Sequence, residues 1–401
     1  MSKEDGFRIS HPLEPDQGLG LYKKERVMNI RPTEAVVDLD AIAFNIRSLK
    51  NHVGPGPRFM AVVKADAYGH GIIHVAKTAA KAGADWLGVA LLEEAVALRR
   101  AGIDLPILVL GEAFSKGAEQ YVEYDIRATV CSLDSLLALN RAGELGGSKV
   151  RVHVKVDTGM GRIGLEPDQV LPMIERAQAL RNIQIEGLFS HFASADEEDK
   201  TFSFDQLDRF KKVISTLENR GIGIPIKHFA GSAATIDIPE SYFDMVRPGI
   251  SIYGAYPSEE VDHSVPLKPA MTMKTAISFL KEVESGTPLS YGRTYRTQRR
   301  SRIATLPVGY GDGYPRLLSN RGEVLVAGQR APVVGRVCMD MTLIDVTHIP
   351  GVSVGAEVVL FGKQGNAEIR VDELASKTGT ISYEILCTIT KRVPRQYVGA
   401  L

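Results

Sequence analysis

Short apolar runs alternate with longer amphipathic stretches between Phe59 and about Tyr253. Eight runs have the length and composition of buried strands, at residues 59–63, 86–90, 107–110, 126–130, 150–156, 183–189, 226–230 and 243–246. Apolar residues at helical spacing predict helices between them, over 72–80, 92–101, 133–142, 168–180 and 204–220. Alternation of strands and helices is typical of parallel sheets. The pattern predicts an α/β fold with an N-terminal (β/α)₈ TIM-type barrel, and a doubly wound open sheet is the alternative.

The pattern changes after about Pro266, where longer β-rich runs are separated by glycine-containing turns and helical spacing nearly disappears. We therefore expect an N-terminal extension at 1–32, a barrel at 33–265 and a mainly β domain at 266–401. The apolar run at 35–40 is a candidate additional strand of that β domain.

The composition indicates which kind of molecule the protein binds. The chain has 401 residues, and its 48 basic residues balance 48 acidic ones. Without a net field, neither nucleic acid nor an acidic membrane surface is favoured, so we expect a small-molecule partner. Three widely spaced cysteines fit neither a disulfide framework nor a metal site. The polar N-terminus and the lack of a membrane-length apolar window favour a cytoplasmic protein.

Candidate chemistry begins with Lys64, which directly follows the first apolar run and precedes a polar, glycine-containing turn. A strand-end lysine often only extends its amine into solvent. A buried lysine instead has a lowered pKa and can act as a nucleophile or base. The carboxyl ends of barrel strands converge on one mouth, and polar residues follow several other predicted strands: Lys155, Asp157, His191, Ser232 and Arg247. We therefore expect a shared active site.

Glycine accompanies the polar residues after the seventh and eighth strands, in Gly231-Ser232 and in Arg247-Pro248-Gly249-Ile250. Exposed backbone N–H groups and a hydroxyl at this place commonly bind phosphate in such barrels. A phosphate site beside a lysine that can form a Schiff base indicates pyridoxal 5′-phosphate (PLP) as the cofactor.

Seven segments resemble the alanine racemases, PLP-dependent enzymes with an N-terminal barrel and a C-terminal β domain. They span the chain from about Thr33 and read AVVKADAYGHG at 61–71, VKVDTGMGRIG at 154–164, GLFSHFASAD at 187–196, MVRPGISIYG at 245–254, PLSYGRTY at 288–295, PVGYGDGYPR at 307–316 and GRVCMDMTLIDV at 335–346. The resemblance implies racemisation of L- and D-alanine, supplying D-alanine for cell-wall peptidoglycan.

The resemblance also implies two catalytic bases, Lys64, which would hold PLP, and Tyr291. Racemisation moves a proton between opposite faces of Cα, and a base on each face is the simplest solution. Tyr291 lies in the β domain and would reach the lysine of the other subunit, which implies a homodimer with shared sites. Without the resemblance, Tyr291 would be interpreted as a surface turn residue.

Further roles follow from the same resemblance. Arg247 would face the pyridine nitrogen, His191 would bridge Arg247 and Tyr291, and Arg162 would bind the phenolic oxygen and the substrate carboxylate. Lys155 is a candidate carbamylated lysine. Phosphate contacts are expected from Tyr68, Ser232, Gly249, Ile250 and Tyr383, a backbone N–H to the substrate from Met339, and an entrance position for Tyr310.

Three alternatives remain at this point. A racemase of broader specificity, for example for serine, would differ in a few pocket residues. A PLP-dependent decarboxylase of basic amino acids would be expected to pair the pyridine nitrogen with a carboxylate, where this chain has Arg247. A non-enzymatic PLP carrier would not need a β domain that bears Tyr291.

Overall fold

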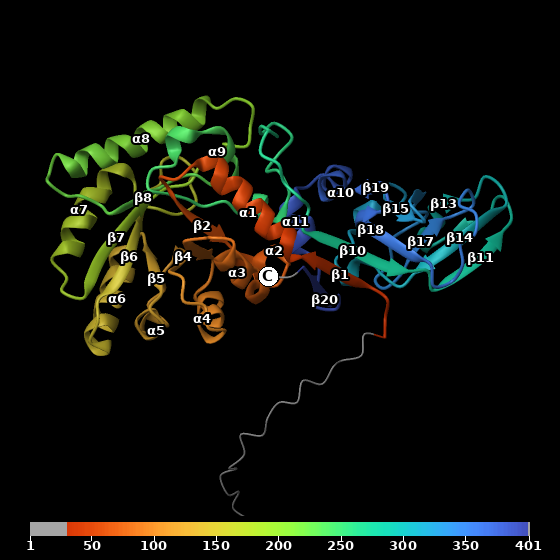
Figure 1. The fold of residues 1–401 in the computed structure, drawn as a ribbon, viewed down its shortest axis with the longest axis horizontal. Helices are drawn as coiled ribbons and strands as arrows, with labels where there is room; N and C mark the ends of the chain where they lie inside the picture. The colour runs from red at the N-terminus through yellow and green to blue at the C-terminus, as the bar shows by residue number, and fades with distance from the viewer. Residues whose placement is uncertain (1–29, 400–401) are drawn as a thin grey trace, which may run out of the picture. The chain divides into compact units, whose positions relative to one another are not determined.

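The computed structural model describes residues 30–399, so all but the last three residues of the predicted extension lie outside the described residues. Eight parallel strands form a closed barrel (Figure 1). They are β2 (Arg58–Val62), β3 (Trp86–Val89), β4 (Ile107–Glu112), β5 (Arg127–Val130), β6 (Val150–Lys155), β7 (Ile183–Phe189), β8 (Ile226–His228) and β9 (Met245–Val246). Because β9 pairs in parallel with β2, the sheet closes. The barrel prediction is confirmed and the open-sheet alternative is wrong.

Helices follow the barrel strands and cover the outside of the barrel (Figure 1). They are α3 (Ile72–Lys81), α4 (Leu92–Arg100), α5 (Ala118–Glu123), α6 (Leu133–Gly146), α7 (Pro167–Gln178), α8 (Thr201–Glu218) and α9 (Ser232–Asp237), with α1 (Leu39–Val53) preceding β2. In α6, the Ser132 hydroxyl accepts from the Ser135 N–H and begins the helix, while Leu136 and Leu139 are buried. Three of these helices, α1, α5 and α9, were not predicted from the sequence. In α5 and α9, six residues are too few to show helical periodicity.

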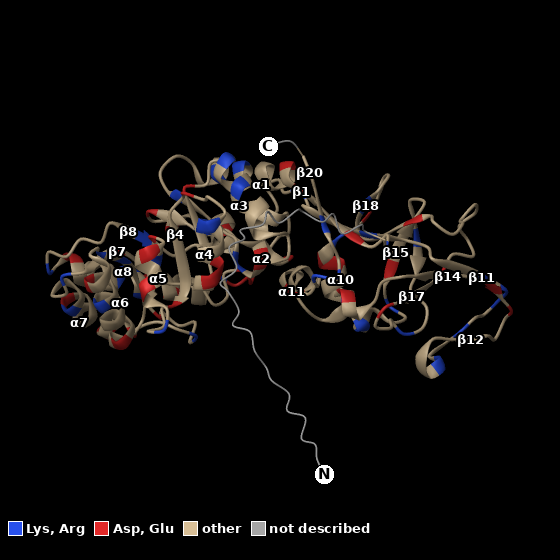
Figure 2. Cartoon of the chain, turned by 90° about the horizontal axis from the view of Figure 1, so that it is seen from below, with Lys and Arg blue, Asp and Glu red and all other residues tan. Residues whose placement is uncertain are grey.

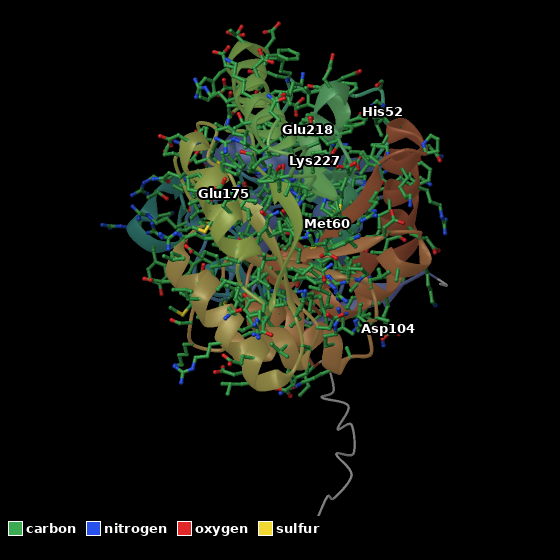
Figure 3. All side chains as sticks on the ribbon, turned by 90° about the vertical axis from the view of Figure 1, so that its left-hand side faces the viewer. His52, Met60, Asp104, Glu175, Glu218 and Lys227 are labelled. Carbon is green, nitrogen blue, oxygen red and sulfur yellow. The ribbon has the colours of Figure 1, made fainter. Side chains whose placement is uncertain are left out.

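The barrel interior contains both apolar and polar side chains. Met60, Trp86, Leu108, Ile226 and Met245 form an apolar cluster contributed by five different strands. Met60, labelled in Figure 3, lies among the strands, whereas Glu175 and Glu218 lie on the surrounding helices. Buried histidines and charged groups occupy the rest of the interior, as described below. Most TIM-type barrels fill this space with branched apolar residues.

The remaining residues form a β-rich part. Its largest sheet has the order β16-β15-β18-β10-β1-β20, with β19 paired to β18. The strands of this part are β1 (Glu34–Asp38), β10 (Met271–Ala276), β11 (Phe279–Val283), β12 (Pro288–Leu289), β13 (Tyr295–Arg296), β14 (Ser301–Leu306), β15 (Glu323–Val326), β16 (Gln329–Pro332), β17 (Thr342–Asp345), β18 (Glu357–Gln364), β19 (Ala367–Ile369) and β20 (Arg395–Val398). As expected, β1 joins this sheet, antiparallel to β10 and parallel to β20.

Two helices interrupt the β-rich part, α10 (Val371–Thr378) and α11 (Ser382–Cys387). Basic and acidic residues are interspersed along both parts of the chain (Figure 2). No helix within residues 30–399 is both long enough and apolar enough to cross a membrane.

Candidate active site

A cavity of about 300 Å³ lies at the carboxyl ends of the barrel strands. Ten of the predicted site residues line it: Lys64, Tyr68, Lys155, Arg162, His191, Ser232, Arg247, Gly249, Ile250 and Tyr383. Val62, Leu110, Phe189 and Gly231 complete the lining. The structure therefore brings together residues that are as much as 319 positions apart in the sequence.

Lys64 begins an unusual turn labelled α2 (Lys64–Tyr68). Ala65, Asp66, Ala67 and Tyr68 all have left-handed φ values, between 51° and 55°. This conformation costs about 1–2 kcal/mol per non-glycine residue. Hydrogen bonds hold the turn, because Asp66 Oδ1 accepts from the Ile72 N–H at 2.8 Å and a carboxylate on α4 accepts from the Ala65 N–H at 2.6 Å. Such strain is typical of functional sites.

That carboxylate belongs to Glu94, which also accepts from the N–H groups of Ala90 and Leu91. The Glu94 carboxylate therefore links the turn after β2 to the turn after β3 by hydrogen bonds. Burial lowers the pKa of Lys64, the positive charge of Arg162 lowers it further, and Glu94 partly opposes these effects. A larger share of Lys64 is consequently in the neutral, nucleophilic form than for an exposed lysine.

Arg247 lies just after β9 and is only 5% exposed. Its Nη2 donates to the carbonyls of Ser190 at 2.8 Å and Phe229 at 2.9 Å, and its Nη1 contacts His228 Nδ1 at 2.9 Å. Burial lowers the pKa of Arg247 to about 9, so the guanidinium is still a cation at neutral pH. Within the described residues, no carboxylate forms an ion pair with Arg247.

The neighbour of Arg247 in the cavity is His191. Its Nδ1 lies 3.3 Å from Arg247 Nη2, and because arginine can only donate, Nδ1 accepts and the ring proton is on Nε2. Burial, and next the charge of Arg247, lower the pKa of His191 well below its ordinary value. His191 is therefore neutral, with one N–H left to donate.

Lys155 is the most deeply buried amine of the site, at 4% exposed. Its ammonium lies 4.6 Å from the ring centroid of Phe189, close enough for a cation–π contact. Burial, followed by the charge of Arg247, lowers the pKa of Lys155 to about 7.

Neutral hydrogen-bonding groups gather at another part of the cavity lining. The Ser232 hydroxyl accepts from the Gly249 N–H at 2.8 Å. A methyl group added at Gly249 would lie 2.5 Å from the Tyr68 hydroxyl oxygen, so only glycine leaves room there. The ring of Tyr68 is 5.8 Å from that of Tyr383 on α11. Uncharged hydroxyls and backbone N–H groups in this arrangement fit a phosphate dianion, while Lys64 and Arg247 fit the ring of PLP.

Three predicted site residues lie outside this cavity. Tyr291 is 73% exposed between β12 and β13, and Met339 is 52% exposed. Tyr310, 40% exposed, lines a different cavity together with Tyr314 and Leu317. Ten of these thirteen predicted residues thus line the cavity of a single chain, and Asp157, also expected at the mouth of the barrel, does not line it.

The sequence did not predict the buried histidines His153 and His228 or the partly buried Glu186, which are linked to Arg247 by hydrogen bonds. A signal for His153 was available, because side chains two positions apart in a strand share a face. His153 is two residues before Lys155 on β6 and therefore points the same way. Asp340 forms an ion pair with Arg392.

The closed barrel, the lysine at its mouth and the β-rich part define the class of barrel-type PLP enzymes. Family models agree in detail: "Alanine racemase, N-terminal domain" matches residues 37–257 and "Alanine racemase, C-terminal domain" matches residues 270–397. The chain belongs to the alanine racemase family and is a PLP-dependent amino-acid isomerase.

Individual relatives support this assignment. The chain is 52% identical to an alanine racemase of Halothermothrix orenii over 92% of this chain and 97% of the relative. It is 46% identical to one from Methanococcus maripaludis, over 92% and 99%. Its structure matches alanine racemase from a D-cycloserine-producing Streptomyces lavendulae with a TM-score of 0.89, at 38% identity over 92% and 98% of the chains. A Bacillus anthracis alanine racemase with bound L-Ala-P matches with a TM-score of 0.86, at 39% identity over 92% and 95%.

Proposed function

We propose that this chain interconverts L-alanine and D-alanine by a two-base mechanism in a cytoplasmic homodimer, and that it supplies D-alanine for peptidoglycan. The observation that carries the proposal is the convergence of Lys64, His191, Ser232 and Arg247 on one cavity. When bound, PLP supplies the electron sink that makes the Cα proton of an amino acid removable. The residues of the chain decide which proton moves and where it returns.

Lys64 is the residue that holds the cofactor and the base on one face of the substrate. Its lowered pKa favours a free amine that can accept the Cα proton. The strained turn supports this role, because four left-handed residues held by Asp66 and Glu94 fix the direction in which the lysine leaves the backbone.

The second base is Tyr291 of a partner subunit. Its phenol is exposed and does not line the cavity of its own chain. In a head-to-tail dimer, the neutral His191 would donate its Nε2–H to that phenol oxygen and favour the phenolate. Tyr310 and Met339 are exposed as well, and are proposed to complete the entrance and the substrate site across the same interface.

Arg247 would face the pyridine nitrogen of bound PLP. A cation at this place can donate a hydrogen bond, but it would disfavour a second positive charge on the ring. Arg247 would thereby favour return of the proton to Cα, as racemisation requires. A decarboxylase or aminotransferase would be expected to use a carboxylate at this place.

The remaining cavity residues would bind and orient the cofactor and the substrate. Tyr68, Ser232, Gly249, Ile250 and Tyr383 would hold the phosphate. Arg162 would hold the phenolic oxygen and the substrate carboxylate, and a carbamate on Lys155 would turn a repelling ammonium into an anion that orients Arg162.

The test is D/L interconversion by purified enzyme on a panel of amino acids. We expect alanine to react fastest; faster turnover of serine or another amino acid would contradict the substrate assignment. Borohydride should attach the cofactor covalently to Lys64. The attached cofactor should be absent from Lys64→Ala and present in the matched control Lys77→Ala, which changes an exposed lysine on α3. Attached cofactor in Lys64→Ala would remove the cofactor assignment.

A further inference from the structure

A chain of hydrogen bonds runs from Arg247 through the barrel interior. Arg247 Nη1 lies 2.9 Å from His228 Nδ1, and His228 Nε2 lies 2.8 Å from His153 Nδ1. His153 Nε2 then lies 3.3 Å from Glu186 Oε2. The arginine and both histidines are at most 5% exposed. This chain begins at the cavity and ends on β7, inside the barrel wall.

The two ends of the chain determine where every proton lies. An arginine can only donate, so His228 Nδ1 accepts, and its proton must be on Nε2. His228 therefore donates to His153 Nδ1, and the His153 proton must be on Nε2. A carboxylate can only accept, which is what this last proton requires. Starting from Glu186 and working back gives the same assignment.

Neighbouring residues contact this chain of hydrogen bonds and leave room for it. Arg127 Nε also donates to Glu186 Oε2, at 3.3 Å, which fixes the oxygen that His153 addresses. The ring of Trp86 contacts His153 edge-on, at 5.6 Å between centroids. A methyl group at Gly187 would overlap the imidazole of His153, so glycine on β7 makes space for the ring.

Neutral histidines are required for this arrangement. Burial lowers the pKa of His153, and burial together with the charge of Arg247 lowers the pKa of His228 well below its ordinary value. Each ring therefore carries one proton, and the chain has a single direction from cation to anion.

We infer that Glu186 is a positioning residue for Arg247: its acceptor oxygen holds His153, and His153 through His228 holds the guanidinium. This rests on the proposed role of Arg247 at the pyridine nitrogen. Because Arg247 can only donate, both histidine protons stay on Nε2 when the acceptor at position 186 is removed. The Nε2–H of His153 then lacks its carboxylate partner, which is unfavourable for a buried group. His153 moves away from His228, and the guanidinium loses the fixed partner of its Nη1.

Two variants of similar volume separate the acceptor from packing. Glu186→Gln keeps a carbonyl oxygen for His153 and Arg127, whereas Glu186→Leu removes it. Nitrogen-15 spectra of labelled histidines, with and without PLP, report which ring nitrogen carries the proton. The matched control is Glu218→Leu, an exposed position on α8 that is labelled in Figure 3.

We expect protons on Nε2 of His153 and His228 in the unmodified protein and in Glu186→Gln. In Glu186→Leu we expect both protons to remain on Nε2, the Nε2 signal of His153 to shift because it has lost its carboxylate partner, and kcat to fall about tenfold, with KM changed by less than about twofold. Protons on Nδ1 in the unmodified protein would overturn the inference even if Glu186→Leu failed to fold.

Unchanged spectra and kcat in Glu186→Leu would overturn it too. So would an equal loss in Glu186→Gln, because the charge rather than the acceptor would then matter. The spectra do not depend on turnover. An absence of racemisation with the expected proton positions would therefore contradict the proposed function and leave the histidine chain in place.

Discussion

Lys155 should destabilise the folded protein in a pH-dependent way, and Lys155→Met should relieve the effect. The pKa of Lys155 falls from 10.5 to about 7 on folding, chiefly because of burial and next because of Arg247. Each pKa unit corresponds to about 1.4 kcal/mol, so the protonated amine costs about 5 kcal/mol of unfolding free energy. Methionine has a similar length and carries no charge.

The direction of the effect follows from the two pKa values. Above about pH 10.5 the amine is neutral in both states, and it costs nothing through this mechanism. As pH falls, the unfolded chain binds the proton first, so stability is lost between about pH 10.5 and about pH 7. Below about pH 7 both states are protonated and the full cost is present.

Urea denaturation of cofactor-free protein in carbon-dioxide-depleted buffer is the assay. The stability of Lys155→Met minus that of the unmodified protein should rise by up to about 5 kcal/mol from pH 10.5 to pH 6. If a carbamate forms, added bicarbonate should stabilise the unmodified protein but not Lys155→Met, because only the folded protein holds the modified lysine. Carbon-13 bicarbonate should give a carbamate signal that Lys155→Met lacks. A difference that does not vary with pH in depleted buffer would refute the reasoning.

Other variants test the proposed phosphate site and the active site shared between subunits. Gly249→Ala should weaken PLP affinity at least about tenfold, because its methyl group would lie 2.5 Å from the Tyr68 hydroxyl. Unchanged affinity in equilibrium dialysis would contradict the assignment of Gly249 to the phosphate site. Tyr291→Phe should lose α-proton exchange preferentially from L-alanine, measured in deuterated water, and equal loss from both enantiomers would indicate general damage. Mixing the inactive variants Lys64→Ala and Tyr291→Phe should restore up to about a quarter of the activity, because each mixed dimer keeps one intact site; no recovery would mean that both bases act within one chain.

The order of the barrel strands and of the helices α3, α4, α6, α7 and α8 could be predicted because each strand is a short apolar run and each of these helices shows its own periodicity. The long helix α1 was not predicted. Strand limits differ from the prediction by at most two residues, at the end of the run at 107–110, at the end of the run at 226–230 and at the start of the run at 243–246. The residues that face the cavity could be predicted because parallel strands bring their carboxyl ends to one mouth.

Two features of the site, a left-handed turn and a contact between buried histidines, could not be predicted from the sequence. The left-handed turn at 65–68 is built from alanine, aspartate and tyrosine rather than glycine, so local preference gives no hint of it. Tertiary hydrogen bonds from Asp66 and Glu94 override that preference. The contact between His153 and His228 joins β6 to β8, which lie on either side of β7, and sequence spacing alone does not show which interior side chains meet.

The use of neutral histidines beside Arg247 has a physical reason. A carboxylate in direct contact would satisfy the buried guanidinium, but it would also cancel much of the positive field that reaches the cavity. Histidine accepts a hydrogen bond without adding a charge, so Arg247 keeps its field while its Nη1 proton is still bonded. The nearest hydrogen-bonded anion along this chain, Glu186, is separated from Arg247 by two imidazole rings. At that distance it can hold the two histidines in place and leave the charge at the cavity largely intact.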